Sequence, residues 1–366
     1  MIIVLLMESE ILKMKLMKSL NLKDKFLKLP IIQGGMGIGV SRCRLAGAVA
    51  KEGGMGVLST AQIGYDDPDF TKYPEETNLR VLPEQIRKAK EIAGGNGMVA
   101  VNIMAVTQLY ETYVKTACAA GVDAIISGAG LPTELPKFAE GYDVALAPIV
   151  SSTKSANVIL KFWDKKYHRT ADFLVIEGPL AGGHLGFSRE QLEDIPGLDY
   201  DTEIRNIITL KQTYEEKYQT AIPVFVAGGM FTAEDVKHVL ELGADGIQAA
   251  TRFVATEECD ASDAYKQAYV NASEEDVIII KSPVGMPGRA IKNAFIQRML
   301  AAPDKISHCF NCLKACNPAT APYCITQALI NAVVGDLDNG LIFCGSRVGE
   351  IREITTVPKL MQELTV

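Results

Sequence analysis

The chain has 366 residues, of which 48% are hydrophobic, and a formal net charge of −7 at pH 7. The sequence has no long block of Lys or Arg, which argues against binding to a nucleic-acid backbone or an anionic membrane surface. No apolar run reaches the roughly 18 residues of a membrane-spanning helix, so we expect neither nucleic acid nor membrane as a partner.

Residues 1–27 are expected to be an N-terminal tail or helix. Residues 1–7 are apolar, but this run is too short to cross a bilayer and no small-residue cleavage site follows it. Lysines then alternate with apolar residues from Lys13 to Lys28. Nothing in this segment predicts secretion.

Eight short apolar runs alternate with helix-like segments, which is typical of a parallel sheet with helical crossovers. The pattern predicts an α/β TIM (β/α)8 barrel over residues 28–260, with an open doubly wound sheet as the alternative. Residues 261–366 are expected to be a mostly helical, cysteine-bearing C-terminal extension packed on the barrel. The predicted strands are Pro30–Met36, Gly54–Thr60, Met98–Met104, Val122–Gly128, Val144–Ser152, Phe173–Glu177, Ile222–Ala227 and Gly246–Phe253.

Two of the predicted crossover helices carry clear end signals. Ser41 is a candidate N-cap for the helix that follows the first strand, and Gly53 can end that helix with a positive φ. Thr232 begins the helix after the seventh strand, with Asp235 three residues later as a capping-box variant. Gly243 is the expected stop of that helix.

Glycines and polar residues gather where the predicted strands end, which is the edge that carries the active site in TIM barrels. The Gly228-Gly229 pair and the helix that starts near Thr232 together offer backbone N–H groups and the positive end of a helix dipole. The ligand is therefore expected to carry a phosphate. The strand-end residues singled out are Gln33, Gly34, Gly35, Met36, Asn102, Glu177, Gly183, Gly228, Gly229, Ala250 and Thr251.

His184 stands out among these strand-end residues. The apolar run Phe173–Glu177 ends in a glycine-rich loop, and Gly182 and Gly183 directly precede the histidine. Glycines allow the backbone to approach a planar ligand closely, and imidazole is well matched to proton transfer near neutral pH. We predict a base beside a cofactor; the alternative is a histidine that only packs or caps.

With these residues the chain resembles the nitronate monooxygenases, formerly called 2-nitropropane dioxygenases. That family shares a flavin-binding barrel with the flavin-type enoyl-ACP reductases. The resemblance covers about residues 28 to 300. Four segments carry it: Pro30-Ile-Ile-Gln-Gly-Gly-Met36 with Gly53-Gly-Met-Gly56, Val101-Asn102, Glu177-Gly178 through Ala181-Gly-Gly-His184, and Ala227-Gly-Gly229 leading to Thr251-Arg-Phe253.

The resemblance implies a non-covalent FMN across the mouth of the barrel. Gln33, Gly35, Met36 and Asn102 would lie around the isoalloxazine, and Glu177 would hydrogen-bond near the ring. The phosphate would be received by the loops at Gly228-Gly229 and at Ala250-Thr251.

The same resemblance implies a catalytic role for His184. It would remove the proton α to the nitro group of a neutral nitroalkane, while the nitronate anion passes an electron to the flavin and O2 completes the reaction. The alternative within enzymes is an NAD(P)H-dependent enoyl-ACP reductase; a phosphate-ligand barrel without catalysis is the alternative outside them. The partners expected are a small-molecule substrate with O2 or NAD(P)H, and a second copy of the chain in a homodimer.

The sequence departs from the family pattern at two loop positions. Leu180 occupies the place where the family usually has a glutamate before Ala-Gly-Gly-His, and Ala250 replaces the usual glycine before the last threonine. The glycine- and proline-rich segment 282–289 is a candidate cover for the barrel mouth, where Arg289 would meet an anionic substrate; an ordinary surface turn is equally compatible with it.

Four of the eight cysteines fall within sixteen residues: Cys309, Cys312, Cys316 and Cys324. In a chain without a secretion signal this crowding does not suit a disulfide framework, so a reducing cytoplasm is expected. The spacing would let four thiolates hold an iron–sulfur cluster or zinc, but it contains only one Cys-x2-Cys pair. We therefore predict no metal and interpret these residues as packed free thiols.

Overall fold

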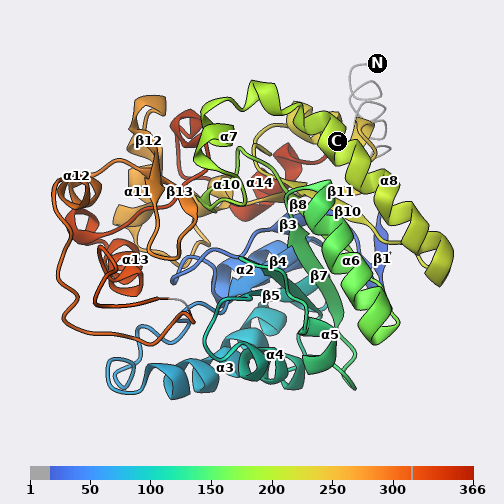
Figure 1. Cartoon of the computed structure of the whole chain (residues 1–366), viewed down its shortest axis with the longest axis horizontal. Helices are drawn as coiled ribbons and strands as arrows, with labels where there is room; N and C mark the ends of the chain where they lie inside the picture. Colours follow the sequence, from blue (N-terminus) through green and yellow to red (C-terminus); the bar gives the residue numbers. More distant parts are fainter. Residues whose placement is uncertain (1–16, 315) are drawn as a thin grey trace.

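The computed structural model describes residues 17–314 and 316–366. Eight parallel strands close into a barrel (Figure 1), in which the last strand pairs back onto the first through Gln248 and Ile32. The TIM barrel predicted from the sequence is therefore confirmed. The strands are β3 (Ile31–Gln33), β4 (Met55–Ser59), β5 (Met98–Met104), β6 (Ala124–Gly128), β7 (Ala145–Val150), β8 (Leu174–Glu177), β10 (Val224–Ala227) and β11 (Gly246–Ala249).

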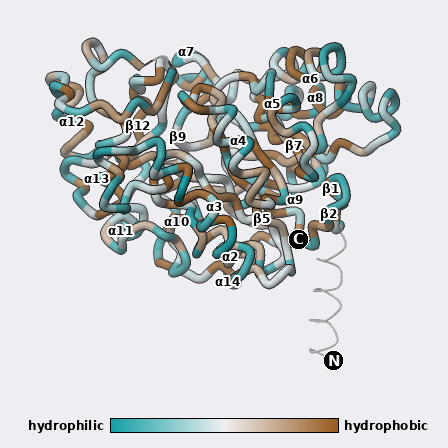
Figure 2. The backbone as a smooth tube through the Cα atoms, turned by 90° about the horizontal axis from the view of Figure 1, so that it is seen from below, coloured by the Kyte–Doolittle hydropathy of each residue, from teal (hydrophilic) through white to brown (hydrophobic). Residues whose placement is uncertain are grey.

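Helices follow the barrel strands and surround the sheet (Figure 1). Apolar residues concentrate on the strands, whereas the helices carry many hydrophilic residues (Figure 2). The helices of the barrel are α2 (Cys43–Lys51), α3 (Pro74–Ala93), α4 (Tyr110–Ala119), α5 (Leu135–Phe138), α6 (Thr153–Tyr167), α7 (Arg189–Glu193), α8 (Tyr200–Tyr218), α9 (Ala233–Glu241) and α10 (Thr251–Val254), with a 3-10 turn η1 at Pro196–Leu198.

Side chains of unequal size fill the barrel interior. Phe173 and Phe225 meet edge to face with ring centroids 5.6 Å apart, while β6 and β7 contribute the small residues Ala124 and Ala145 to the same buried cluster. Pairing large residues with small ones lets the interior fill without voids. The barrel is thus a packed core, and ligands are restricted to its mouth.

The structure of residues 20–27 differs from the N-terminal tail or helix that is expected from the sequence. They form an antiparallel hairpin of β1 (Leu20–Leu22) and β2 (Lys25–Leu27). Leu22 and Leu27 are fully buried in the cluster that fills the barrel interior. Leu20-Asn21-Leu22 alternates apolar and polar residues with the period of two that suits a strand, which explains the difference. Residues 1–16 lie outside the described part of the chain.

Two predicted element ends also change. The eighth strand ends at Ala249, and α10 begins at Thr251, so the run to Phe253 is not strand. Ser41 is not the N-cap of α2: its hydroxyl faces the barrel, and Asp260 accepts hydrogen bonds from the backbone N–H groups of the first turn instead. The Thr232–Asp235 capping box of α9 is confirmed, as are the positive φ of Gly53 and the end of α9 just before Gly243.

Most of the C-terminal extension lies to the left of the barrel in Figure 1, whereas its last helix, α14 (Val357–Glu363), packs against α2 and α10. Its hairpin, β12 with β13, forms a three-stranded antiparallel sheet with β9 (Gly183–His184), a short strand from the loop after β8. Among the described residues, no helix combines the length and the apolar character needed to cross a membrane. The elements are α11 (Asp263–Asn271), η2 (Glu274–Asp276), β12 (Val277–Lys281), β13 (Pro287–Ile291), α12 (Ala294–Ala301), α13 (Ile325–Val334), η3 (Leu337–Asn339), η4 (Val348–Glu350) and α14 (Val357–Glu363).

Candidate functional site

A cavity of about 460 Å³ lies at the carboxyl ends of the barrel strands. It brings together residues from the loops after all eight barrel strands and from the C-terminal extension. All the strand-end residues predicted from the sequence line it except Gln33: Gly34, Gly35, Met36, Asn102, Glu177, Gly183, His184, Gly228, Gly229, Ala250 and Thr251.

Gln33 does not line the cavity, because its side chain points into the barrel wall. The amide nitrogen donates to Ser41 Oγ at 2.9 Å and to the carbonyl of Gly34, and the amide oxygen accepts the N–H of Val57 at 3.1 Å. The residue is fully buried. Its side chain therefore joins β3 to β4 and to the loop before α2.

His184 is held between the barrel and the C-terminal extension. It lies in β9, where its backbone pairs with Gly288 of β13. Its Nε2 atom lies 2.7 Å from the hydroxyl oxygen of Ser282, and its ring meets the edge of Phe343 with centroids 5.0 Å apart. Burial lowers the pKa of His184 to about 4, so the imidazole is neutral at pH 7.

Glu177 ends β8 and faces the same cavity. Burial raises the pKa of this carboxyl to about 7. Tyr200 donates its hydroxyl to the backbone carbonyls of Glu177 and Ser151, but no donor in the described chain reaches the Glu177 carboxyl group. Near pH 7 the Glu177 carboxyl is therefore protonated in about half of the molecules. It can donate a hydrogen bond to a ligand as well as accept one.

The turn after β10 presents free backbone N–H groups to the cavity. Gly228 and Gly229 have φ values of 90° and 84°, which L-residues with side chains rarely adopt. A Cβ at Gly228 would lie 2.9 Å from the backbone of Ala181. Within the described residues, the N–H groups of Gly229 and Met230 donate to no protein acceptor. This arrangement suits an anion, and we call the turn formed by Gly228, Gly229 and Met230 the anion seat.

Thr251, at the start of α10, and residues of the C-terminal extension also line the cavity. Thr251 accepts a hydrogen bond from the N–H of Gly345 at 3.0 Å, and Ser346 donates both its N–H and its hydroxyl to the carbonyl of Leu180 at 3.2 Å. Sequence reasoning did not find Gly345, Ser346 or Arg347, because they follow the barrel by nearly a hundred residues. It also did not give Ser282 a role.

The segment 282–289 covers the cavity, as one of its two interpretations predicts: Val284 and Met286 line the mouth. Arg289 does not face a substrate. It is 3% exposed and donates to the carbonyls of Pro179 and Ala181, so it holds the loop that leads to His184.

The segment around Phe310 also lines the cavity. The Phe310 ring stacks on Phe70 with centroids 5.4 Å apart, and Asn311 donates to Glu75 at 2.8 Å. Cys312 also lines the cavity. All eight cysteines are free thiols, and no three acidic, histidine or cysteine side chains in residues 17–314 and 316–366 are grouped to hold a metal ion.

The sequence model of the nitronate monooxygenase family matches residues 19–366. The chain belongs to the nitronate monooxygenase family. Members of this family are flavin-dependent oxidoreductases, and the protein is an enzyme of that class. A probable nitronate monooxygenase of Staphylococcus saprophyticus is 26% identical over 301 residues, covering 76% of this chain and 80% of that protein. One from Staphylococcus aureus is 26% identical over 293 residues, covering 75% and 78%.

Solved structures of several other proteins share the fold. FabK from Thermotoga maritima superposes with a TM-score of 0.66 and 25% identity over 92% of this chain and 91% of that one. A nitroalkane oxidase from Streptomyces ansochromogenes gives a TM-score of 0.67 with 20% identity, over 92% and 95%. The enoyl reductase domain of MlnA from Bacillus amyloliquefaciens gives 0.64 with 14% identity, over 93% of both chains.

Proposed function

We propose that the protein oxidises alkyl nitronates with O2, using FMN as its cofactor and His184 as the base for neutral nitroalkanes. The observation that carries this proposal is the placement of a neutral imidazole, fixed by Ser282, in the same cavity as a glycine-lined anion seat. A proton acceptor and a phosphate site in one cavity are what a phosphorylated redox cofactor and a carbon acid together require.

The residues of the cavity fit FMN. The free N–H groups of Gly229 and Met230 match phosphate oxygens. A Cβ at Gly183 would meet no protein atom within 4 Å, so this backbone borders open space in which a planar ring fits. Gly34, Gly35, Met36, Asn102 and Glu177 would hold the ring system, and Gly228, Gly229, Ala250 and Thr251 the phosphate. Bound FMN supplies electron transfer between the nitronate and oxygen.

His184 performs the proton transfer in this proposal. With its Nε2–H donated to Ser282, the Nδ1 lone pair is free to accept the α proton of a nitroalkane. The lowered pKa keeps this acceptor unprotonated throughout the neutral range. Phe343 restricts the tilt of the ring, so the acceptor atom holds one orientation. Val284 and Met286 line the same cavity and would limit the access of water to it.

Anaerobic reduction of the bound flavin tests this proposal. The purified protein is mixed with propyl 1-nitronate without O2, and absorbance near the flavin maximum is followed; the released flavin is identified by chromatography after denaturation. We expect FMN, its bleaching by the nitronate alone, and reoxidation on admission of O2. A protein that binds no FMN, or whose flavin the nitronate leaves oxidised, contradicts the proposal.

An NAD(P)H-dependent enoyl thioester reductase is the second candidate. The fold shared with the MlnA enoyl reductase domain and the apolar side chains at the covered end of the cavity favour it, since an acyl chain needs such a surface. Met104, Leu313 and Leu329 are among these side chains. Rapid anaerobic bleaching by NADH or NADPH, with no response to nitronate, would establish the reductase instead.

A further inference from the structure

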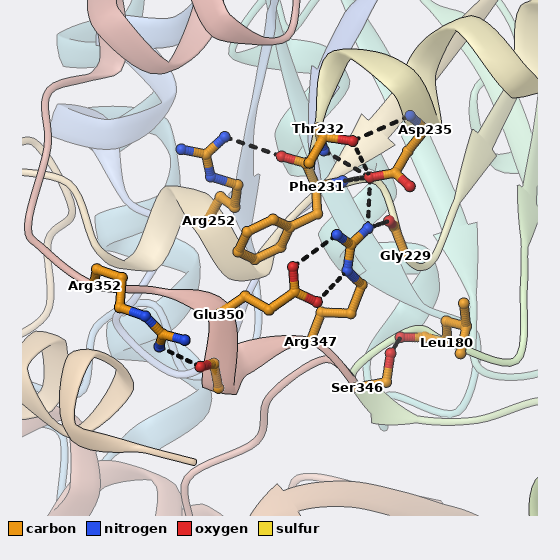
Figure 3. Close-up of polar contacts among 11 residues, drawn as sticks. Leu180, Gly229, Phe231, Thr232, Asp235, Arg252, Ser346, Arg347, Glu350 and Arg352 are labelled. Atoms are coloured by element: carbon orange, nitrogen blue, oxygen red, sulfur yellow. Dashed lines mark hydrogen bonds and ion pairs between the residues drawn. The ribbon is translucent and has the colours of Figure 1, made fainter. Parts of the chain in front are cut away.

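Arg347 of the C-terminal extension reaches the turn after β10 (Figure 3). Its Nη1 atom donates to the carbonyl of Gly229 at 3.2 Å and to the Asp235 carboxylate at 2.5 Å. Glu350 holds the other side of the guanidinium through Nε and Nη2. The guanidinium carbon lies 4.8 Å from the centroid of the Phe231 ring. The guanidinium is therefore held by two carboxylates, a backbone carbonyl and an aromatic ring.

The bond to the Gly229 carbonyl sets the direction of one N–H group of the anion seat. The carbonyl of Gly229 and the N–H of Met230 belong to the same peptide unit, and in a trans peptide these two groups point in opposite directions. When Arg347 holds the carbonyl, the N–H of Met230 must face the other way, where no described protein group accepts it. Arg347 thus orients a donor that it does not touch.

Arg347 also compensates the negative charge of Asp235, which lies close to the anion seat. The Asp235 carboxylate accepts the N–H groups of Phe231 and Thr232 in the capping box of α9. Burial alone would raise the pKa of Asp235, but hydrogen bonds from Thr232 and from Arg347 outweigh it and leave that pKa below its usual range. Asp235 is therefore ionised, and without Arg347 its charge would repel an anion bound at this turn.

The neighbouring residues tie the same segment to two other loops. Gly345 donates to Thr251 after β11, and Ser346 donates to Leu180 after β8. A Cβ at Gly182 would lie 2.5 Å from the backbone of Cys344, so the loop and the segment are in close contact. Residues 344–347 therefore join the loops after β8, β10 and β11.

We propose that Arg347 is a positioning residue of the phosphate seat, through which the C-terminal extension makes the site selective for the phosphorylated flavin. The inference rests on the proposed FMN site. It concerns the binding of the phosphate group, and the ring of the flavin serves as the internal reference. Riboflavin has the same ring without the phosphate.

The test compares the Kd of FMN with that of riboflavin, measured by quenching of flavin fluorescence on titration with apoprotein. We expect Arg347→Ala to weaken FMN binding by about 10-fold or more, as loss of a charged hydrogen-bond partner does, and to change riboflavin binding less than about 2-fold. Arg347→Lys keeps the charge and should retain part of the affinity for FMN. Arg352→Ala is the matched control, because within residues 17–314 and 316–366 Arg352 donates only to the carbonyls of Gly349 and Ile351, and the substitution should leave both Kd values unchanged.

A second variant separates electrostatic positioning from a general loss of structure. In Arg347→Ala/Asp235→Asn the carboxylate is gone, so FMN affinity should rise relative to Arg347→Ala. Equal weakening of FMN and riboflavin in Arg347→Ala would show a merely structural role and overturn the inference, as would unchanged FMN binding. A wild-type protein that binds neither flavin would instead overturn the proposed function itself.

Discussion

Ser282 and His184 share a hydrogen bond of 2.7 Å although 98 positions separate them in the chain. Ser282 is buried at the end of β12, and the backbone N–H of Val284 also points at its hydroxyl oxygen. The orientation of the proposed base therefore depends on a residue outside the barrel.

Replacing Ser282 by alanine should lower kcat/KM for a neutral nitroalkane by about 10-fold, because the imidazole loses the partner that fixes its tautomer. Ser282→Thr, which keeps the hydroxyl, should restore most of the activity. Steady-state kinetics together with the Kd of FMN measure the effect. An equal loss of FMN affinity in Ser282→Ala would mean that the residue shapes the cavity and does not orient the base.

His184→Asn should distinguish two substrate forms. The proposed base is needed only for the neutral nitroalkane, since a preformed nitronate has already lost its proton. We expect a loss of about 100-fold or more in turnover of the nitroalkane and a much smaller change with the nitronate, measured as oxygen consumption. Equal losses with both forms would contradict the proton-transfer role.

The raised pKa of Glu177 predicts that the stability of the apoprotein depends on pH. The pKa of this carboxyl rises from 4.5 to about 7 on folding, so the folded state favours the protonated carboxyl, and stability falls as the pH rises from about 4.5 to about 7. The cost at high pH is at most about 3 kcal/mol by linkage. Glu177→Gln should therefore gain stability over the wild type at pH 8 and little at pH 5, as measured by urea unfolding. A gain that does not depend on pH would refute this explanation.

Gln33→Leu should destabilise the protein without removing a flavin contact. The substitution leaves the N–H of Val57 and the hydroxyl of Ser41 without their buried partner, at a cost of about 1–3 kcal/mol each. Urea unfolding should show this loss, while the absorption spectrum of the bound flavin stays that of the wild type. A shifted spectrum with normal stability would favour the contact with the isoalloxazine that the sequence resemblance implies.

The cysteines should differ in their reaction with a thiol reagent. Cys309 is exposed, whereas Cys118, Cys259 and Cys344 are buried, and burial raises the pKa of Cys344 to about 12. In the native protein Cys309 should be labelled first, and the three buried thiols only after unfolding, as peptide mapping can show. If Cys309 resists labelling until a chelator is added, it is a metal ligand.

The barrel was predictable because its signals are local and repeated. Each strand is an apolar run, and the capping box at Thr232 and the glycine at Gly53 are read from a few adjacent residues. The glycines after β10 and the histidine after β8 could be placed at the mouth because the carboxyl ends of all the strands meet there.

The partners of these residues were not predictable, because they arrive from distant parts of the chain. The sequence predicts that Ser41 caps α2, but in the structure Asp260 accepts the N–H groups of the first turn. The Ser41 hydroxyl instead accepts a hydrogen bond from the Gln33 side chain. Arg289 looks like an anion ligand in a glycine-rich turn, but the fold buries it against two carbonyls. A side chain's type shows what it can bond, whereas its partner depends on the tertiary fold.

The pairing of β9 with β13 means that the barrel is not a separable module. A gene fragment ending near residue 260 would encode all eight strands, yet His184 would lose Ser282, and the loop before it would lose the Arg289 clamp. Such a fragment would contain the barrel strands but not the residues that orient the chemistry at their ends. Recombination between relatives therefore has to exchange the His184 loop and the hairpin as one inherited unit.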